Sequence, residues 1–449
     1  MTKKFVLICS ALVIASLLLN ACATATPTAV VETQPTKSTG EIKIGFISAF
    51  TGVFSSFGKM QKEGAELALE EFNYTAGGKK ITVIYEDDQL DNEKAVTKAK
   101  KLVEQDKVDI LTGLVSGDEG LTVGEYMKDK GIPVVPMYSA SEDMTMREFF
   151  PMIVRATWTG AQSMDVFGYW LATEKGYKKI YMIGEDYSYP WNQAGGFKRG
   201  FCRGGGVEVK SVWFPPGTTS DFSSMIAAIP LDQGYDAVLY NGAGGDAVNF
   251  IKQWSELGMV GKIPLLGQSN TFEKPDLDSM PKNIVGYLSP HHTADDLNTP
   301  EWNAFKEAFV KKYGYPPSAA SEFAYTSMRL ILRAIEAVNG DVSDKTKLVE
   351  AMLKVDLTDT PRGPVKLDPT YHSAIGNVYI REVAADDSGA LYNKGILTVK
   401  NVSQFGPYDP ALYMAQPGDD NTYPPDLCAD FPSEMLSAPT VYTYLPFGQ

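Results

Sequence analysis

Cysteine, histidine and positive charge are scarce in this chain. Its 449 residues include four cysteines and three histidines, and acidic residues outnumber basic ones, giving a formal net charge of −14. Nucleic acids and anionic membrane surfaces attract basic faces, so this charge predicts no nucleic-acid partner and no charge-driven membrane binding. The histidines offer no set of metal ligands at a recognisable spacing, and nothing in the sequence indicates a metal or other cofactor. Beyond residue 21 no apolar run is long enough to cross a bilayer.

The N-terminus has the pattern of an export signal. Two lysines precede an apolar run that ends at Leu19, and small residues then flank Cys22. This order predicts a lipoprotein signal peptide over residues 1–21 with the lipid on Cys22; the alternative is a plain secretory signal in which Cys22 is incidental. Residues 22–40, rich in Thr, Ala, Pro and Val, are predicted to form a flexible tether. The mature protein is therefore expected outside the cytoplasm, held by lipid to the bacterial cell membrane.

Two cysteines remain once the signal peptide and the lipid site are set aside. Cys202 and Cys428 form an even pair in a compartment that permits oxidation. A disulfide between them is predicted, and two separate buried thiols are the alternative.

One strand, loop and helix organise the first part of the mature chain. Residues 42–47 form a short, apolar, β-branched run, which predicts a buried strand. A loop rich in Ser, Thr and Gly follows over residues 48–56, and apolar residues then recur at helical spacing from Phe57. The N-terminus of this helix is expected at the carboxyl end of the strand, where free N–H groups suit an anionic or carbonyl oxygen.

Strand and helix patterns alternate through most of the remaining sequence. Such alternation predicts parallel pairing in open, doubly wound sheets. A second series begins near Arg155, so we expect an α/β fold with two doubly wound parallel-sheet lobes. The expected strands after the first are residues 81–85, 108–112, 132–135, 179–183, 207–214, 236–240 and 263–266, with late strands at 371–383 and 395–400.

Polar loops follow several of these strands. In open α/β sheets ligands bind at the carboxyl ends of the strands. Residues 116–119 and 138–141 are small and hydroxylic like residues 48–56, so we expect the three loops to form one ligand-binding edge. Ordinary polar turns are the alternative for any one of them.

Two enzyme signatures occur and neither is supported by its surroundings. Residues 242–247 match the dinucleotide fingerprint G-x-G-x-x-A, but the following strand ends without the acidic residue that would hold a ribose. Residues 56–59 match S-x-x-K of penicillin-recognising hydrolases, yet S-D-N and K-T-G are both absent. The protein is therefore predicted not to be an enzyme.

The order of these motifs resembles that of the leucine/isoleucine/valine-binding proteins, the type I periplasmic solute-binding family of ABC importers. The resemblance rests on Ile42–Gly45, the Thr51–Gly52 turn, the Phe57–Gly58 pair and the following helix rich in Gly, Ala and Glu. It covers roughly residues 41–400 and implies a hinge of three crossovers, near residues 155–158, 289–293 and 360–364. The implied lobes are 41–155 plus 292–361 and 156–291 plus 362–403. Residues 404–449 depart from the family and are expected to wrap one lobe or to bind a partner.

The resemblance also implies a ligand site. Hydroxyl and backbone N–H groups of the first lobe would hold a carboxylate, and aromatic side chains would close over the ligand. The residues at matching positions are Phe57, Ser116, Gly117, Ser139, Ala140, Ser141, Tyr189, Ala243 and Ser269. Ser269 stands where relatives that bind amino acids place an acid for the ammonium group, although Asp118, Glu119, Glu185 or Asp246 are possible substitutes from other strand ends.

These features predict an extracytoplasmic solute-binding protein. It would capture a small polar or carboxylate-bearing ligand, either amino acid-like or an organic or aromatic acid, and deliver it to an ABC transporter permease. A ligand-sensing module for a membrane receptor is the alternative. Because a buried ammonium needs a carboxylate partner, Ser269 favours an organic or aromatic acid over leucine, isoleucine or valine.

Overall fold

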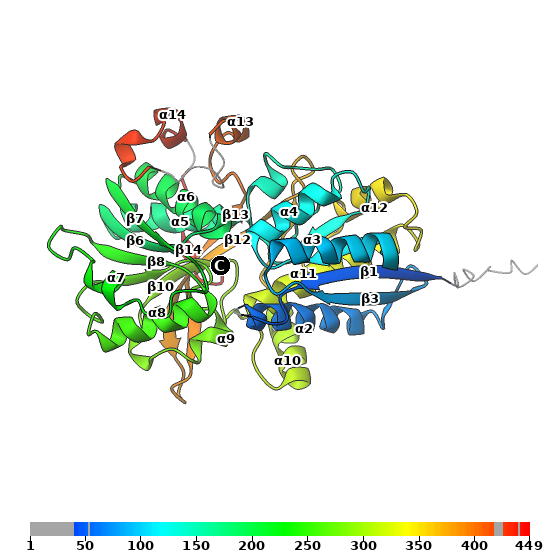
Figure 1. Ribbon diagram of the computed structural model, residues 1–449, viewed down its shortest axis with the longest axis horizontal. Helices are drawn as coiled ribbons and strands as arrows, with labels where there is room; N and C mark the ends of the chain where they lie inside the picture. Colours follow the sequence, from blue (N-terminus) through cyan, green and yellow to red (C-terminus); the bar gives the residue numbers. More distant parts are fainter. Residues whose placement is uncertain (1–39, 53, 417–424, 439–440) are drawn as a thin grey trace, which may run out of the picture. The chain divides into compact units, whose positions relative to one another are not determined.

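The computed structural model describes residues 40–52, 54–416, 425–438 and 441–449. The expected signal peptide, Cys22 and most of the expected tether lie outside the described residues. Two β-sheets organise the described chain (Figure 1). We call the part built on the five-stranded sheet the first lobe and the part built on the larger sheet the second lobe.

The first-lobe sheet has the strand order β2-β3-β1-β4-β5. β1, β3, β4 and β5 pair in parallel, and the short β2 pairs antiparallel with β3. Most of β1 is buried because strands lie on both sides of it and helices cover its faces. The strands are β1 (Glu41–Ser48), β2 (Thr75–Ala76), β3 (Lys79–Asp87), β4 (Ile110–Gly113) and β5 (Val134–Pro136).

Helices from two distant parts of the sequence cover this sheet. The long helix α11 packs against α2, so late residues complete the core of the first lobe (Figure 1). A Cβ on Gly64 would lie 1.9 Å from the Ser321 carbonyl oxygen, so a glycine is needed for α2 to approach α11 this closely. The helices of this lobe are α2 (Ser55–Glu71), α3 (Asn92–Lys100), α4 (Gly117–Met127), α10 (Pro300–Tyr313), α11 (Ala319–Ala337) and α12 (Lys345–Met352).

The second-lobe sheet is mixed, which differs from the parallel sheet expected for it. Its main strand order is β14-β13-β12-β10-β9-β8-β6-β7, and β11 pairs with β12. The neighbours among β6, β7, β8, β9 and β10 pair in parallel. The neighbours among β10, β12, β13 and β14 pair antiparallel. The reason is local: only a short turn joins β12 to β13, and so short a connection can form a hairpin but not a parallel crossover.

The remaining elements of the second lobe are as follows. The strands are β6 (Lys179–Glu185), β7 (Glu208–Phe214), β8 (Ala237–Asn241), β9 (Leu265–Gly267), β10 (Leu288–His291), β11 (Lys366–Leu367), β12 (Ala374–Ala385), β13 (Leu391–Val402) and β14 (Leu445–Pro446). The helices are α5 (Gly160–Thr173), α6 (Ser188–Arg203), α7 (Ser223–Ala227), α8 (Gly244–Glu256) and α9 (Lys274–Leu277).

Three segments that pass between the lobes contact one another. The segments are residues 155–158, 289–293 and 360–364. The Arg362 guanidinium donates to the Thr157 carbonyl at 3.2 Å, which joins the third of these segments to the first. The Trp158 ring lies 5.0 Å from the His291 ring, which joins the first segment to the second. The chain therefore crosses between the lobes through one packed bundle of segments.

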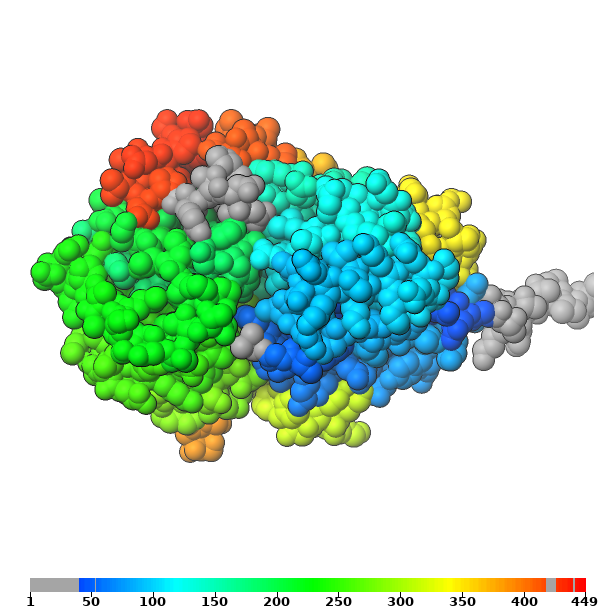
Figure 2. Space-filling model, in the orientation of Figure 1, coloured from blue at the N-terminus to red at the C-terminus, as the bar shows by residue number. Residues whose placement is uncertain are grey.

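The C-terminal segment, residues 404–449, contains the short helices α13 (Pro410–Met414) and α14 (Ser433–Leu436). It lies on the second lobe (Figure 2), where a disulfide joins Cys428 to Cys202 of α6. The segment also contacts the first lobe, because Gln404 exchanges hydrogen bonds with Thr145 at 2.7 and 3.2 Å. The expectation that this segment wraps a single lobe is therefore incomplete.

Candidate functional site

A small cavity lies where the strands of both lobes end. Its volume is about 20 Å³, room for roughly one water molecule. Most residues of its wall lie within about four residues of the end of a parallel strand, as expected for open α/β sheets. The wall consists of Phe54, Phe57, Leu90, Val115, Ser116, Tyr138, Trp158, Tyr187, Tyr189, Ala243 and Asn270.

Aromatic rings make up the first-lobe wall. The Phe57 ring lies 5.6 Å from Phe54 and 5.3 Å from Tyr138, and all three side chains are buried. The rings are tilted, the geometry that aromatic pairs prefer over a face-to-face sandwich. Gly58 permits this arrangement, because a Cβ there would lie 2.1 Å from the Ala49 carbonyl oxygen. Without a glycine, α2 could not bring Phe57 so close to the end of β1.

Trp158 joins the aromatic rings of the two lobes. It is fully buried, and its ring lies 5.4 Å from Tyr138 and 5.6 Å from Tyr189. Its indole N–H donates to the Tyr138 carbonyl at 3.0 Å, which fixes the ring relative to the end of β5. A buried Trp with a satisfied N–H is a rigid apolar surface, and the Trp158 ring lines the cavity between the aromatic residues of the two lobes.

The second-lobe wall contains two tyrosines from the start of α6. The Tyr187 and Tyr189 rings lie 6.4 Å apart, and the Tyr189 hydroxyl donates to Gln268 Oε1 at 3.0 Å. Burial raises the pKa of both hydroxyls well above the ordinary value. Both side chains therefore stay neutral and offer a ligand aromatic faces and hydroxyl groups, not charge.

Ser116 begins helix α4 and belongs to the first-lobe wall. Its Oγ accepts from the Glu119 N–H at 3.1 Å, and Glu119 Oε2 accepts from the Ser116 N–H at 2.8 Å, which completes a capping box. The Ser116 backbone N–H is thus already paired within the protein. No described residue accepts its hydroxyl hydrogen, which can therefore be donated to a ligand oxygen.

A pair of buried acids lies behind Ser116. The Glu119 carboxyl lies beside that of Asp88, and two buried carboxyl groups this close do not both ionise readily, so the pair shares a proton. Burial and the Asp88 charge raise the pKa of Glu119 to about 8, and burial raises the pKa of Asp88 to about 6. The shared proton leaves the pair with one negative charge beside the first turn of α4, which also contains Asp118, so an anion near Ser116 depends on hydrogen-bond donors such as the Ser116 hydroxyl.

Among the described residues of the cavity wall there is no Asp, Glu, Lys, Arg or His side chain. Behind the second-lobe side of the wall lies Glu185, whose Oε1 accepts from the N–H of the wall residue Ala243 at 3.2 Å. Burial raises the pKa of Glu185 well above its ordinary value, so this side chain is a neutral carboxylic acid. Asp246 accepts instead from the Gly217 N–H at 2.6 Å. No substitute for the missing acid at Ser269 therefore faces the cavity among the described residues.

The structure gathers four of the nine predicted ligand residues on the cavity wall: Phe57, Ser116, Tyr189 and Ala243. The other five lie close by without lining it. Ser139 Oγ donates to Met144 Sδ at 3.2 Å, the Ala140 and Ser141 carbonyls accept from Gly160 and Arg155, and Gly117 abuts Ser188. Ser269 Oγ lies 2.7 Å from Ser163 Oγ. A contact of these five with ligand stays a prediction.

Several wall residues are absent from the nine ligand residues selected from the sequence. Tyr138 and Tyr187 are each the second residue after a strand, a position that could have identified them. Asn270 lies three residues beyond β9, next to the selected Ser269. Trp158 lies in a crossing segment and follows no strand, so no local pattern marks it.

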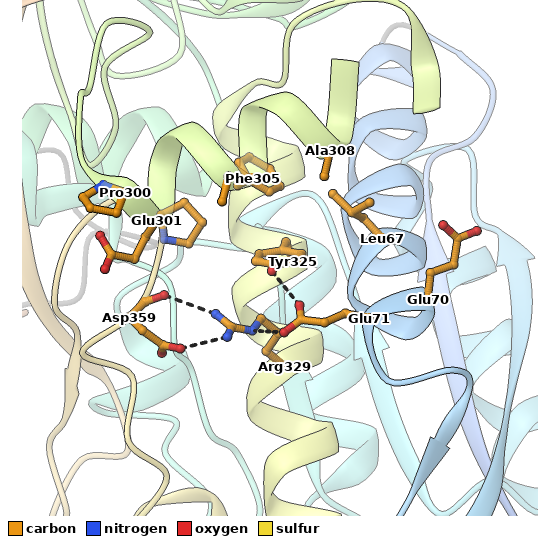
Figure 3. Close-up of a pocket in the computed structure, with 12 residues that line it drawn as sticks. Leu67, Glu70, Glu71, Pro300, Glu301, Phe305, Ala308, Tyr325, Arg329 and Asp359 are labelled. Carbon is orange, nitrogen blue, oxygen red and sulfur yellow. Dashed lines mark hydrogen bonds and ion pairs between the residues drawn. The ribbon is translucent and has the colours of Figure 1, made fainter. Parts of the chain in front are cut away.

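A larger groove of about 640 Å³ lies on the first lobe, between α2, α10 and α11 (Figure 3). Its wall shares no residue with the cavity. Arg329 pairs there with Glu71 at 3.4 Å and with Asp359 at 2.8 Å, and Tyr325 donates to Glu71 at 2.6 Å (Figure 3). The groove wall is acidic overall, so it does not suit a carboxylate ligand.

Neither metal ligands nor membrane spans are found in the described part of the chain. No group of three or more His, Cys, Asp or Glu side chains there could hold a metal ion. No helix there is long and apolar enough to cross a membrane.

Comparison with known proteins identifies the family. A family model described as periplasmic binding protein matches residues 41–389. The chain belongs to the periplasmic binding protein family. The Leu/Ile/Val-binding protein homolog 6 of Brucella melitensis is 31% identical over 362 residues, which span 80% of this chain and 91% of that relative.

Solved structures of the family are similar to this chain. A solute-binding protein of an ABC transporter from Rhodopseudomonas palustris BisB5, in complex with 3,4-dihydroxybenzoic acid, has a TM-score of 0.76 and 28% identity, with 81% of this chain and 98% of that chain covered. A second one, from Rhodopseudomonas palustris HaA2 in complex with p-hydroxybenzoic acid, has a TM-score of 0.75 and 29% identity, with the same coverage.

Membership of the family confirms the predicted fold class and the predicted type of function. Periplasmic binding proteins capture small molecules outside the cytoplasm for ABC importers, and the similar proteins are binding proteins, not enzymes.

Proposed function

We propose that this periplasmic binding protein captures a compact aromatic carboxylate between its lobes and delivers it to an ABC transporter permease. The observation that carries the proposal is the cavity wall, which combines six aromatic side chains with no ionised group. An aromatic ring gains contact area and favourable ring geometry against such a wall. The benzoic acids carried by the two similar solute-binding proteins support the same ligand class.

The carboxylate would bind at the first-lobe side. Ser116 offers a hydroxyl donor there, because its Oγ only accepts within the capping box of α4. Branched-chain amino acids, suggested by the name of the Brucella relative, are disfavoured. Their ammonium group would meet no Asp or Glu side chain among the described residues of the cavity wall.

Binding would require the lobes to separate and close again. A cavity of about 20 Å³ cannot admit a benzene ring while the aromatic side chains hold these positions. We propose that the lobes are residues 41–155 plus 292–361 and 156–291 plus 362–403, and that the packed crossing segments are the hinge. X-ray scattering should then show a smaller radius of gyration with ligand than without it.

A thermal-shift and calorimetric screen tests the ligand class. Benzoate, 4-hydroxybenzoate and 3,4-dihydroxybenzoate should stabilise the protein by mass action, whereas leucine, isoleucine and valine should not. Protein refolded from denaturant should be used, so that no carried-over ligand occupies the site. Stabilisation by the amino acids alone would refute the proposal.

Two cavity variants and one control sharpen this screen. Phe57→Ala and Tyr189→Ala should each weaken aromatic-acid binding at least about tenfold, because each removes a ring from the wall. Tyr126→Ala removes a ring that lies outside the wall and bonds Glu104, and its affinity should equal that of the wild type. Equal losses in all three variants would indicate a general effect on folding.

A further inference from the structure

Among the described residues of the cavity wall, Asn270 is the one with an amide side chain, and its oxygen is already hydrogen-bonded. The Tyr138 hydroxyl, from the first lobe, donates to Asn270 Oδ1 at 3.0 Å. His291 Nε2, from the end of β10, lies 3.3 Å from the same oxygen. Asn270 is 4% exposed, so its environment in the closed protein is almost wholly protein and cavity.

The contacts of His291 settle which of its nitrogens carries the proton. Its Nδ1 accepts from the Thr293 backbone N–H at 3.2 Å and therefore cannot carry a proton itself. Burial and the Arg381 charge hold the pKa of His291 well below its ordinary value, so the ring is neutral. The proton is on Nε2, which donates to Asn270 Oδ1.

This assignment fixes the orientation of the Asn270 amide. Its oxygen must face His291 and Tyr138, because a neutral His291 that donates from Nε2 would clash with an N–H donor. In the described chain, Asn270 Nδ2 donates no hydrogen bond. The amide therefore keeps two unused N–H donors on a residue that lines the cavity.

The loop around Asn270 is braced, so the amide is held in place before a ligand arrives. The Asn270 backbone N–H donates to Gln268 Oε1 at 2.7 Å, and the same oxygen accepts from the Tyr189 hydroxyl. Arg381 donates to the Ser269 carbonyl at 2.9 Å from beneath the loop. A donor fixed in this way loses little conformational freedom on binding.

We propose that Asn270 is a specificity-determining residue of the second lobe, whose Nδ2 donates to a ring oxygen of the ligand, such as a phenolic hydroxyl oxygen. The inference rests on the proposed function, in which the carboxylate binds beside Ser116 on the first lobe. The opposite lobe then meets the other end of the ring. A site that donates to a ring oxygen discriminates against a ligand without one, because its buried donor is left unpaired.

Calorimetry with benzoate, 3-hydroxybenzoate and 4-hydroxybenzoate tests the inference. Wild-type protein should bind at least one hydroxybenzoate about tenfold more tightly than benzoate. Asn270→Asp keeps an oxygen for Tyr138 and His291 but lacks the amide donors, and Asn270→Ala lacks both. Each should bind hydroxybenzoate about tenfold more weakly than wild type, so that the preference over benzoate disappears.

The control is Asn283→Asp, which makes the same change at an exposed amide that bonds Ser255, and it should keep the wild-type preference. Circular dichroism and the thermal midpoint show whether each variant folds. If Asn270→Asp does not fold, the binding measurements are made with Asn270→Ala alone. A preference that survives in a folded Asn270 variant would overturn the inference and leave the proposed function standing. Equal losses for benzoate and hydroxybenzoate would overturn it too, because Asn270 would then hold the carboxylate. A wild-type protein that binds none of the three acids would remove both proposals.

Discussion

Tyr413 is hydrogen-bonded to Glu142 across 271 residues of sequence. Tyr413 belongs to helix α13 of the C-terminal segment, whereas Glu142 belongs to the first lobe, directly after the loop that follows β5. The same hydroxyl accepts from Arg199 of α6 in the second lobe. One tyrosine therefore connects both lobes in the arrangement in which the cavity is closed.

This connection should favour ligand binding. Tyr413→Phe removes the hydroxyl and is expected to weaken ligand binding about three- to tenfold, because a hydrogen bond that exists only with the lobes closed stabilises the closed form. The measurement is the Kd of an aromatic acid by calorimetry, together with X-ray scattering.

The matched control is Tyr442→Phe. Tyr442 donates to Asp165 at 2.6 Å, entirely on the second-lobe side, so its loss should lower the thermal midpoint and leave the Kd unchanged. Equal Kd values for wild type and Tyr413→Phe would show that the Tyr413 hydroxyl does not act on closure.

The disulfide between Cys202 and Cys428 closes a loop with a sequence separation of 226. Replacing both residues by serine should lower the free energy of unfolding by about 3 to 5 kcal/mol, because the unfolded chain regains conformational freedom. Denaturant unfolding of wild type with and without reductant should give the same difference. Mass spectrometry of protein taken from its native compartment should find no free thiol at either position.

The pKa of Glu119 makes stability depend on pH. It is raised from 4.5 to about 8 in the folded protein, so the folded state binds a proton that the unfolded state has released over this range. The contribution of this bound proton to the free energy of unfolding is fully present below about pH 4.5 and is lost as the pH rises through 8. Wild-type protein should therefore lose more than about 1 kcal/mol of unfolding free energy between pH 5 and 8 relative to Glu119→Gln.

Glu125→Gln is a suitable comparison for the pH experiment, because Glu125 lies on the same helix with its side chain 70% exposed. It should follow the wild-type profile. Identical profiles for wild type and Glu119→Gln would contradict the assignment of a shared proton to Asp88 and Glu119.

Cys22 is proposed to carry a lipid, as its flanking small residues and the preceding apolar run predict. Cys22→Ala should move the protein from the membrane fraction to the soluble fraction, and labelling with a radioactive fatty acid should be lost. Ligand affinity should not change, since the binding lobes begin after the expected tether. Full retention of the variant in the membrane fraction would refute a lipid anchor at Cys22.

The sequence alone predicted the α/β class, the family and the location of the binding edge. Strand and helix periods are local properties, and they determine where each strand ends. Because parallel strands bring their carboxyl ends together, Phe57, Ser116 and Tyr189 could be expected near one another without coordinates. The missing acid at Ser269 was likewise visible in the sequence, and it already favoured an organic acid over an amino acid.

Tertiary structure decided which groups face the cavity and in what chemical state. Ser269 and Ser139 follow strands as Ser116 does. Their hydroxyls, however, are hydrogen-bonded to Ser163 and Met144 respectively, and these partners come from other elements. The protonation of Glu119 depends on Asp88, and the orientation of Asn270 depends on Tyr138 and His291. Side-chain direction and pKa are set by such distant neighbours and by burial, and local periodicity in a sequence carries no information about either.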